Sequence, residues 1–348
     1  MLPALRRTVV FLRESQLLNK IGVALSITII AVAAYILYHI VKDIDVDNVI
    51  NALRETQPVH VLLAGLFVVL GYFTLTFYDL FALRTIGRSD VPYRIAALAG
   101  FTSYSVGHNV GASVFTGGAV RYRIYSAWNL DAVEVAKLCF IAGVTFWLGN
   151  AAMLGIGILY QPEAASSIDQ LPPWLNRVFA VAVLAVLVTY VAWVWIAPRI
   201  IGGAQLSVRL PGGPLTLLQV AIGIVDLSFC ALAMYMLVPD EPFIDFITIA
   251  VIFVSATLLG FASHSPGGLG VFDAAMMVGL WQFDKEELLA GLLLFRVLYY
   301  LTPFIISLAI LATREMMSGV KAARAIGAVP DGQEAPPRTP LPRETDSV

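Results

Sequence analysis

Long apolar runs alternate with short polar segments along most of the chain. The runs cover residues 21–41, 59–83, 135–160, 174–197, 215–238, 243–262 and 288–313. An α-helix rises about 1.5 Å per residue, so about 20 apolar residues cross the hydrocarbon core of a bilayer. The pattern therefore predicts an all-α, polytopic integral membrane protein.

A first irregular region, residues 95–125, interrupts this pattern with small and polar side chains. These include Ser105, His108, Asn109, Gly117 and Gly118, and the region ends with Arg121 and Arg123. If residues 96–115 simply crossed, both arginines would lie outside the cell, against the positive-inside tendency. The region is therefore predicted to form a re-entrant hairpin that returns to the cytoplasmic face.

A second irregular region, SHSPGGLGVFD at residues 263–273, lies between two apolar runs. Its polar side chains and helix breakers are Ser263, His264, Ser265, Pro266, Gly267, Gly268, Gly270 and Asp273. Proline lacks a backbone donor and glycine favours non-helical backbone. Such a break is tolerated in a membrane only where protein or a water-filled cavity surrounds it. The sequence thus predicts a translocation or head-group site around this break.

The charges in the loops suggest the domain organisation but not the number of crossings. A basic leader (1–20), a transmembrane domain (21–315) and a proline-rich, disordered cytoplasmic tail (316–348) are expected. Counting 271–281 as a short, broken crossing gives about eight crossings, whereas a re-entrant 264–281 gives about six. Both counts keep the basic loops and both termini cytoplasmic. About eight crossings with re-entrant or broken helices is the preferred interpretation.

Composition excludes a soluble protein and most cofactor sites. Hydrophobic residues make up 59% of the 348 residues, charged residues only 13%, and the mean hydropathy is +0.81. Soluble proteins carry about 25% charged residues. Cys139 and Cys230 lie inside apolar runs, and the four histidines form no ligand pair. No metal, cofactor, nucleotide or nucleic acid is therefore expected.

Four ionisable residues, Asp79, Arg121, Asp226 and Arg296, lie within or beside the apolar runs. A charge at mid-membrane costs roughly 2.5–3.5 kcal/mol on insertion scales, so such residues pair or face a cavity. The favoured hypothesis is one network of these four residues lining a cavity. The alternative is that ion pairs only lock helix packing.

The last apolar run carries a stripe that suits an anionic head group. Arg296, Tyr299, Tyr300 and Pro303 share one helical face, and a guanidinium binds phosphate with two hydrogen bonds. An interfacial aromatic belt is the alternative role for the tyrosines. Asp273, just after the glycines, is expected to cap a half-helix, with cation binding as the alternative.

The two irregular regions echo each other, since each has paired glycines after a serine and a histidine. Paired glycine-broken segments in two halves of a chain point to a transporter site. The two breaks are therefore predicted to come together, with Asp79, Asp226 and Arg296 on the surrounding helices.

Three motifs make the chain resemble the flippase region of the lysylphosphatidylglycerol synthase family. They are GGAVRYR (117–123), SPGGLGVFD (265–273) and FRVLYYLTP (295–303), within a resemblance covering roughly 20–315. The resemblance implies re-entrant helices, a lipid-accessible cavity and movement of lipid between leaflets, with Asp79, Arg121, Asp226 and Arg296 important. Full-length members also carry a C-terminal synthase domain. Here the chain ends in a short tail, so no aminoacyl transfer is expected.

These observations favour a lipid translocase in the bacterial inner membrane. Its expected partners are membrane lipids, whether phospholipid, hopanoid or polyprenyl lipid, and a homo-oligomer is left open. Two alternatives are an intramembrane lipid-modifying enzyme that uses Ser263, His264, Asp273 and Arg296, and a non-catalytic partner in envelope lipid synthesis. No P-loop is found, which leaves facilitated or ion-coupled movement, with Asp79 or Asp226 as proton carrier.

Overall fold

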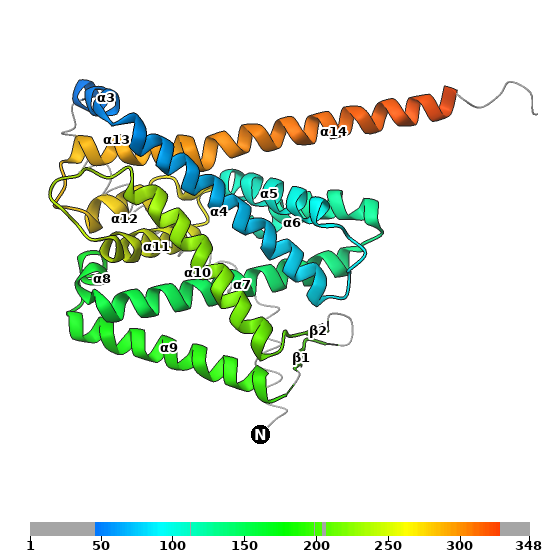
Figure 1. Ribbon diagram of the computed structural model, residues 1–348, viewed down its shortest axis with the longest axis horizontal. Coiled ribbons are helices and arrows are strands. Elements are labelled where there is room, and N and C mark those ends of the chain that lie inside the picture. Colours follow the sequence, from blue (N-terminus) through cyan, green and yellow to red (C-terminus); the bar gives the residue numbers. More distant parts are fainter. Residues whose placement is uncertain (1–45, 112, 198, 204–206, 328–348) are drawn as a thin grey trace, which may run out of the picture. The chain divides into compact units, whose positions relative to one another are not determined.

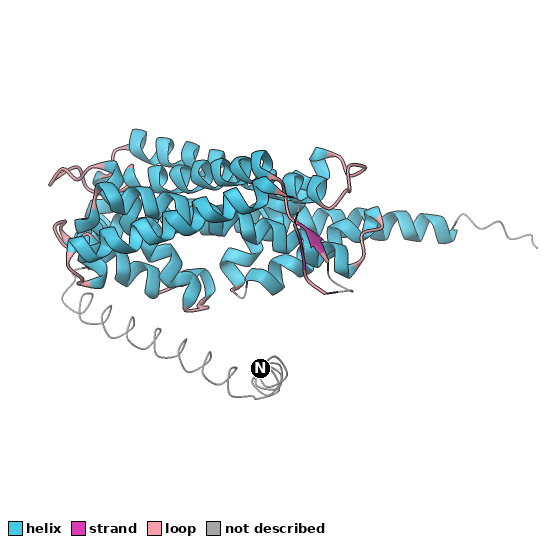
Figure 2. Cartoon of the chain, turned by 90° about the horizontal axis from the view of Figure 1, so that it is seen from below, coloured by secondary structure: helices cyan, strands magenta, loops and turns pink. Residues whose placement is uncertain are grey.

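A computed structural model describes residues 46–111, 113–197, 199–203 and 207–327. These residues are almost entirely helical (Figures 1 and 2). Residues 1–308 and 309–348 form two compact units. The predicted leader (1–20) and first span (21–41) lie outside the described residues, as does the tail beyond residue 327.

The helices and strands follow in this order: α3 Val46–Glu55, α4 Pro58–Thr85, α5 Tyr93–Val110, α6 Ser113–Tyr125, η1 Ser126–Trp128, α7 Ala132–Tyr160, α8 Pro162–Asp169, α9 Pro173–Ile196, β1 Ile200–Ile201, β2 Val208–Arg209, α10 Gly213–Tyr235, α11 Phe246–Ala262, η2 Pro266–Gly268, α12 Val271–Gly279, α13 Lys285–Phe295, η3 Arg296–Leu301 and α14 Thr302–Gly327. The two short strands pair antiparallel. Since α14 continues to Gly327, the first part of the expected tail, 316–327, is helical.

Helix starts follow from local sequence. Proline occupies the first turn of α4, α8, α9 and α10, where its missing donor is harmless. Asp131 caps α7 through the backbone amide of Glu134, while the Glu134 carboxylate accepts from the Asp131 amide. Asp245 and Asp284 cap α11 and α13 in the same manner.

Five helical segments in the described residues are long and apolar enough to cross a membrane. They are α4, α7, α9, α10 and the continuous Lys285–Arg314. Each matches a run predicted from sequence. The run at 243–262 forms α11, which has 17 residues, and the run at 271–281 forms α12, with only 9. The expected count of about eight crossings is therefore not confirmed.

α5 and α6 form a helical hairpin that packs beside α4 (Figure 1). Its two ends are held close by Arg88, in the α4–α5 connection. The Arg88 guanidinium donates to the Trp128 carbonyl oxygen at 2.6 Å and to both carboxylate oxygens of Glu134 at 3.1 Å. It also donates to Asp90 and so lowers the pKa of that exposed carboxyl below its ordinary value. The hairpin thus leaves and returns to the same loop region.

α7 and α10 cross with their backbones in contact. A Cβ atom added to Gly149 would lie only 2.5 Å from the Gly223 Cα atom, so neither position has room for a side chain. One turn away, Gln219 Nε2 donates to Thr145 Oγ1 at 2.8 Å. Small residues and a buried interhelical hydrogen bond are typical of helix crossings in membranes.

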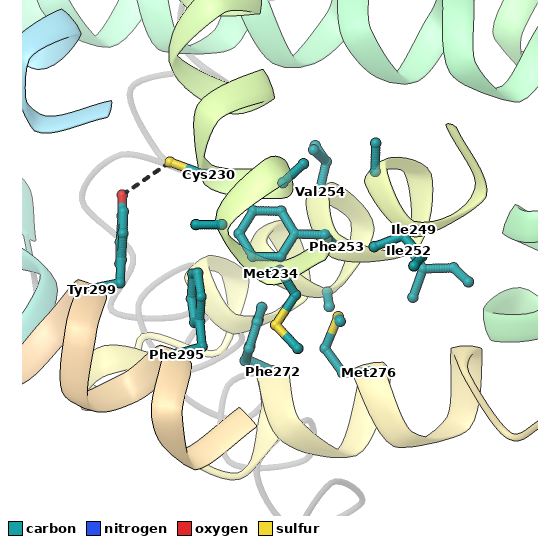
Figure 3. Close-up of a cluster of buried hydrophobic side chains, with 14 of the residues drawn as sticks. Cys230, Met234, Ile249, Ile252, Phe253, Val254, Phe272, Met276, Phe295 and Tyr299 are labelled. Carbon is teal, nitrogen blue, oxygen red and sulfur yellow. Dashed lines mark hydrogen bonds between the residues drawn. The ribbon is translucent and has the colours of Figure 1, made fainter. Parts of the chain in front are cut away.

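The core is an aromatic and aliphatic cluster formed where α10, α11, α12 and the α13–η3 helix converge (Figure 3). Phe253, Phe272 and Phe295 contact one another, with ring centroids 5.4–6.1 Å apart. By contrast, most side chains of α9 are exposed, as expected for a helix that faces lipid. The core therefore supports one side of the glycine-rich segment after α11.

Candidate functional site

The end of α5 and the glycine-rich segment after α11 lie together, so the two irregular regions meet as predicted. The glycine pair of the first region, Gly117 and Gly118, forms no break, because both residues lie within α6. Gly111 ends α5 with a φ of 81°, and a Cβ atom there would lie 3.2 Å from the Pro266 Cα atom. Gly267, with a φ of 60°, lies equally close to the end of α5, since an added Cβ atom would be 3.6 Å from the His108 carbonyl oxygen. Both positions need the left-handed backbone that glycine adopts readily.

A third break, the π-helical segment η3, completes the site. Pro303 cannot donate a hydrogen bond back to Tyr299, and the Tyr299 carbonyl oxygen instead accepts from the Tyr72 hydroxyl of α4 at 3.0 Å. The next carbonyl oxygen, that of Tyr300, accepts from Asn109 Nδ2 of α5 at 3.0 Å. Side chains of two other helices thus satisfy the backbone groups that the break frees.

Arg296 joins η3 to the glycine-rich segment. Its Nε donates to Asp273 Oδ1 at 2.8 Å, its Nη2 donates to Oδ2 at 2.5 Å, and its Nη1 donates to the Gly267 carbonyl oxygen at 3.2 Å. Asp273 Oδ2 also accepts from the Gly270 amide at 3.0 Å, so Asp273 caps α12 as expected. The two side chains are 15% and 12% exposed, which leaves an edge of this pair open to the surroundings.

Arg121 forms a second, fully buried pair with Asp79. The Arg121 Nε and Nη2 atoms donate to the carboxylate at 2.7–3.1 Å, and the Tyr125 hydroxyl donates to Asp79 Oδ2 at 2.8 Å. The guanidinium also lies 4.6 Å from the centre of the Tyr104 ring, a cation–π contact. Gly117 allows this approach, because a Cβ atom there would lie 3.1 Å from the Ser103 carbonyl oxygen.

The single four-residue network expected from sequence is not formed. Asp79 pairs with Arg121, and Arg296 pairs with Asp273 rather than with Asp226. Asp226 Oδ2 accepts from the Tyr78 hydroxyl at 3.0 Å instead. The reason is that the chain turns after Gly270, and this turn places the first turn of α12, with Asp273, directly against Arg296.

An aromatic column connects the two arginines. The Tyr104 ring contacts His108, whose ring stacks on Tyr299 with centroids 5.9 Å apart. Tyr299 contacts Tyr300, whose ring centre lies 5.5 Å from the Arg296 guanidinium. Because a π-helical segment has more residues per turn, Tyr300 stays beneath Arg296 while Tyr299 turns inward toward Cys230 (Figure 3). Tyr299 is buried, so it does not belong to an interfacial belt.

The remaining predicted residues lie around these contacts. Arg123 is exposed on the surface of α6, away from the buried pair. A Cβ atom added to Gly118 would lie 3.8 Å from the Cys139 sulfur. Ser263 Oγ lies 2.7 Å from the Gly260 carbonyl oxygen and 2.8 Å from Ser265 Oγ. The His264 Nδ1 atom is 2.9 Å from the Ala262 carbonyl oxygen. Each of Ser263, His264 and Asp273 thus has a bond to a group outside this trio.

Sequence reasoning missed three phenols, Tyr78, Tyr104 and Tyr125. Tyr125 lies four residues after Arg121 and Tyr104 lies four residues before His108, so helical spacing alone indicated both. In apolar runs, however, tyrosines look like ordinary core residues.

Two surface grooves lie away from these contacts. One, of about 450 Å³, runs between α9 and α10, and the other, of about 680 Å³, lies between α8 and the α12–α13 connection. Neither is lined by the Asp79–Arg121 or Asp273–Arg296 pair.

Comparison with known proteins places the chain in a family. Residues 21–307 match the family described as the lysylphosphatidylglycerol synthase TM region. The chain belongs to this family. All three broken elements and both arginine–carboxylate pairs fall within the matched residues.

Relatives differ in length. The chain is 30% identical over 265 residues to the uncharacterized protein slr0712 of Synechocystis sp., which covers 73% of this chain and 80% of that protein. It is 26% identical over 275 residues to the inner membrane protein YbhN of Escherichia coli, covering 77% and 84%. It is also 26% identical over 307 residues to the phosphatidylglycerol lysyltransferase of Staphylococcus haemolyticus, covering 85% of this chain but 34% of that protein.

Proposed function

We propose that the protein is a lipid translocase of the bacterial inner membrane that moves a phospholipid with an anionic head group between leaflets. The observation that carries this proposal is the meeting of three helix breaks around Arg296. A guanidinium, a carboxylate and a set of non-helical backbone groups gather there, at a depth where each is costly without a ligand or a functional role.

The Arg296–Asp273 pair supplies a means of binding the head group. A lipid phosphate offers oxygens with the same spacing as a carboxylate, so it can replace Asp273 on the Arg296 fork. Asp273 keeps its hydrogen bond from the Gly270 amide when Arg296 leaves, which lowers the cost of the exchange. The partial exposure of this pair makes it the first contact for a lipid entering from the bilayer.

The Asp79–Arg121 pair then provides a second binding site for the same lipid phosphate. The aromatic column through Tyr104, His108 and Tyr299 links the two arginines, and its phenols and imidazole offer hydrogen bonds to a passing head group. In this scheme the α5–α6 hairpin re-enters the membrane and moves to open the path, while the acyl chains remain in the bilayer.

The choice of phospholipid rests on the family and on the site. Relatives named phosphatidylglycerol lysyltransferase act at phosphatidylglycerol, whose single phosphate matches one arginine fork. The relative named as an inner membrane protein supports the location. Hopanoids without phosphate lack the group that Arg296 would bind, whereas polyprenyl phosphates share it.

Proteoliposomes with fluorescent phosphatidylglycerol test the proposal, using dithionite to bleach only the outer leaflet. Purified protein should expose inner-leaflet lipid to bleaching. Arg296→Ala should slow the rate of this bleaching at least about tenfold, because the variant lacks the charged hydrogen bonds to the lipid phosphate. Arg177→Ala, which changes an exposed arginine of α9 outside both pairs, is the matched control and should keep the wild-type rate. Equal rates in protein-free and protein-containing vesicles would overturn the proposal. Mass spectrometry of the same vesicles should show unchanged lipids, whereas a new head group would indicate an enzyme.

A further inference from the structure

Asp226 is a buried carboxylate that neither arginine neutralises. It lies on α10 and is only 4% exposed. Its Oδ2 atom accepts one hydrogen bond, from the Tyr78 hydroxyl, and its Oδ1 atom has no hydrogen-bond partner. A buried carboxylate oxygen without a donor requires an explanation, because the cost of leaving it unsatisfied is large.

Phenols and a thiol, not cations, surround this carboxylate. The titratable groups that interact with it are Tyr72 and Tyr78 on α4, Tyr104 on α5, Cys230 on α10 itself and Tyr299 on η3. Among the described residues, α7, α9 and α11 add no charged group to this set, although all three pack against α10. Arg121 and Arg296 are occupied by other carboxylates.

Two further buried polar atoms in the same cluster lack partners. Ser105 is 0% exposed and lies close to Tyr72, and its Oγ atom has no hydrogen-bond partner. The Nδ1 atom of His108, in the aromatic column beside Tyr299, has none either. The cluster thus contains three unsatisfied polar atoms between the two ion pairs.

A proton fits this site better than a metal ion. Protonation of the Oδ1 atom turns this oxygen into a hydrogen-bond donor and removes the negative charge of Asp226. A transition-metal ion would need several anionic or imidazole ligands. No group of three or more His, Cys, Asp or Glu side chains occurs in the part of the chain that the structure describes.

The position of Asp226 connects it to both ion pairs. On one side, Tyr78 directly precedes Asp79 in α4. The Tyr78 ring contacts the Tyr104 ring, and the Arg121 guanidinium lies over that Tyr104 ring. On the other side, Cys230, one turn along α10, lies 3.5 Å from the Tyr299 hydroxyl, next to the Arg296 segment. We infer that Asp226 is a proton-carrying site, and that its loading and unloading drive the movement of lipid past the two arginines. The coupling of this proton site to lipid movement rests on the proposed function.

Infrared spectroscopy tests the proton site without any transport. Wild-type protein in lipid should show the carbonyl stretch of a protonated carboxylic acid at neutral pH, and Asp226→Asn should lack it. Asp90→Asn, which removes an exposed carboxyl, should keep it. The Tyr78→Phe variant removes the one hydrogen bond to Asp226 and should shift the same band, which identifies its origin even if Asp226→Asn folds poorly. Identical bands in wild type, Asp226→Asn and Tyr78→Phe would overturn the proton site.

A pH gradient across proteoliposomes tests the coupling. A gradient of one pH unit should change the wild-type rate of lipid movement by up to about tenfold, because that is the largest effect when one proton moves with each lipid. The Asp226→Asn rate should not respond to the gradient, and a sodium gradient at constant pH should have no effect on either protein. A wild type indifferent to pH, or driven by sodium, would overturn the coupling. If no protein moves lipid, the translocase and the coupling both fail, while the infrared band alone decides the proton site.

Discussion

The side-chain amide of Asn109, at the end of α5, donates a hydrogen bond of 3.0 Å to the backbone carbonyl oxygen of Tyr300 in η3. The two residues are 191 positions apart in the sequence. The bond satisfies a carbonyl oxygen in the π-helical segment and fastens the hairpin to the Arg296 helix. The end of α5 is therefore held by a contact that a head group or a moving hairpin would have to break.

Replacing Asn109 with alanine should destabilise the protein by about 1–3 kcal/mol, because the Tyr300 carbonyl oxygen loses a buried donor. Asn150→Ala is the matched control, since Asn150 Nδ2 bonds only to the Phe146 carbonyl oxygen within its own helix. Thermal unfolding in detergent measures both. Equal midpoints for the two variants would show that the α5–η3 bond contributes nothing to stability.

Replacing Arg121 with alanine should cost about 3–5 kcal/mol, because Asp79 would remain buried with only the Tyr125 hydroxyl as side-chain donor. Arg121→Lys should lie between wild type and alanine, since lysine cannot donate from two forked nitrogens. Arg177→Ala, at an exposed position of α9, should change stability by less than about 0.5 kcal/mol. Denaturant unfolding of the three variants gives the order, and an Arg121→Ala variant as stable as Arg177→Ala would contradict the buried pair.

Exchanging the charges of Asp273 and Arg296 distinguishes the observed partners from those expected from sequence. The double variant Asp273→Arg with Arg296→Asp should regain part of the folded yield that each single change loses. The double variant Asp226→Arg with Arg296→Asp should regain none, because these residues do not pair. Size-exclusion profiles of the membrane extracts report the yield. Recovery by the second pair alone would refute the assignment of partners.

Gly111→Ala should destabilise the protein by at least about 1–2 kcal/mol, since a φ of 81° suits no ordinary side chain and a Cβ atom would press on Pro266. Gly143→Ala in α7 meets no atom within 4 Å and should be neutral or stabilising by up to about 1 kcal/mol. Melting temperatures of the two variants should therefore move in opposite directions or differ by several degrees. A harmless Gly111→Ala would argue against the close approach of the two breaks.

Much of the fold was predictable because a membrane imposes length and hydropathy on each span. The runs at 59–83, 135–160, 174–197 and 215–238 form α4, α7, α9 and α10. Glycine and proline likewise marked the break after α11. Gly117 and Gly118 did not mark a break, because a helix also accepts glycine and both lie within α6. The hairpin followed from the arginines at its end.

Ion partners were not predictable in the same way. Arg296 has Asp226 and Asp273 as candidate acids, and hydropathy does not distinguish them. The choice depends on how the chain turns at Gly270, a local geometry that places Asp273 on Arg296 and leaves Asp226 to Tyr78. The π-helical segment was missed for a similar reason. Pro303 predicts that the helix is disturbed, but it does not predict that the preceding turn widens into a π-helix.

The contact between Gly149 and Gly223 gives this fold a pivot. Two helices that touch backbone to backbone at one point cannot come closer, and the Gln219–Thr145 hydrogen bond one turn away resists sliding. Tilting about the crossing remains the cheapest movement. Asp226 lies only three residues after Gly223, about 4.5 Å along the helix, so such a tilt would displace its carboxylate little while moving the ends of α10 more.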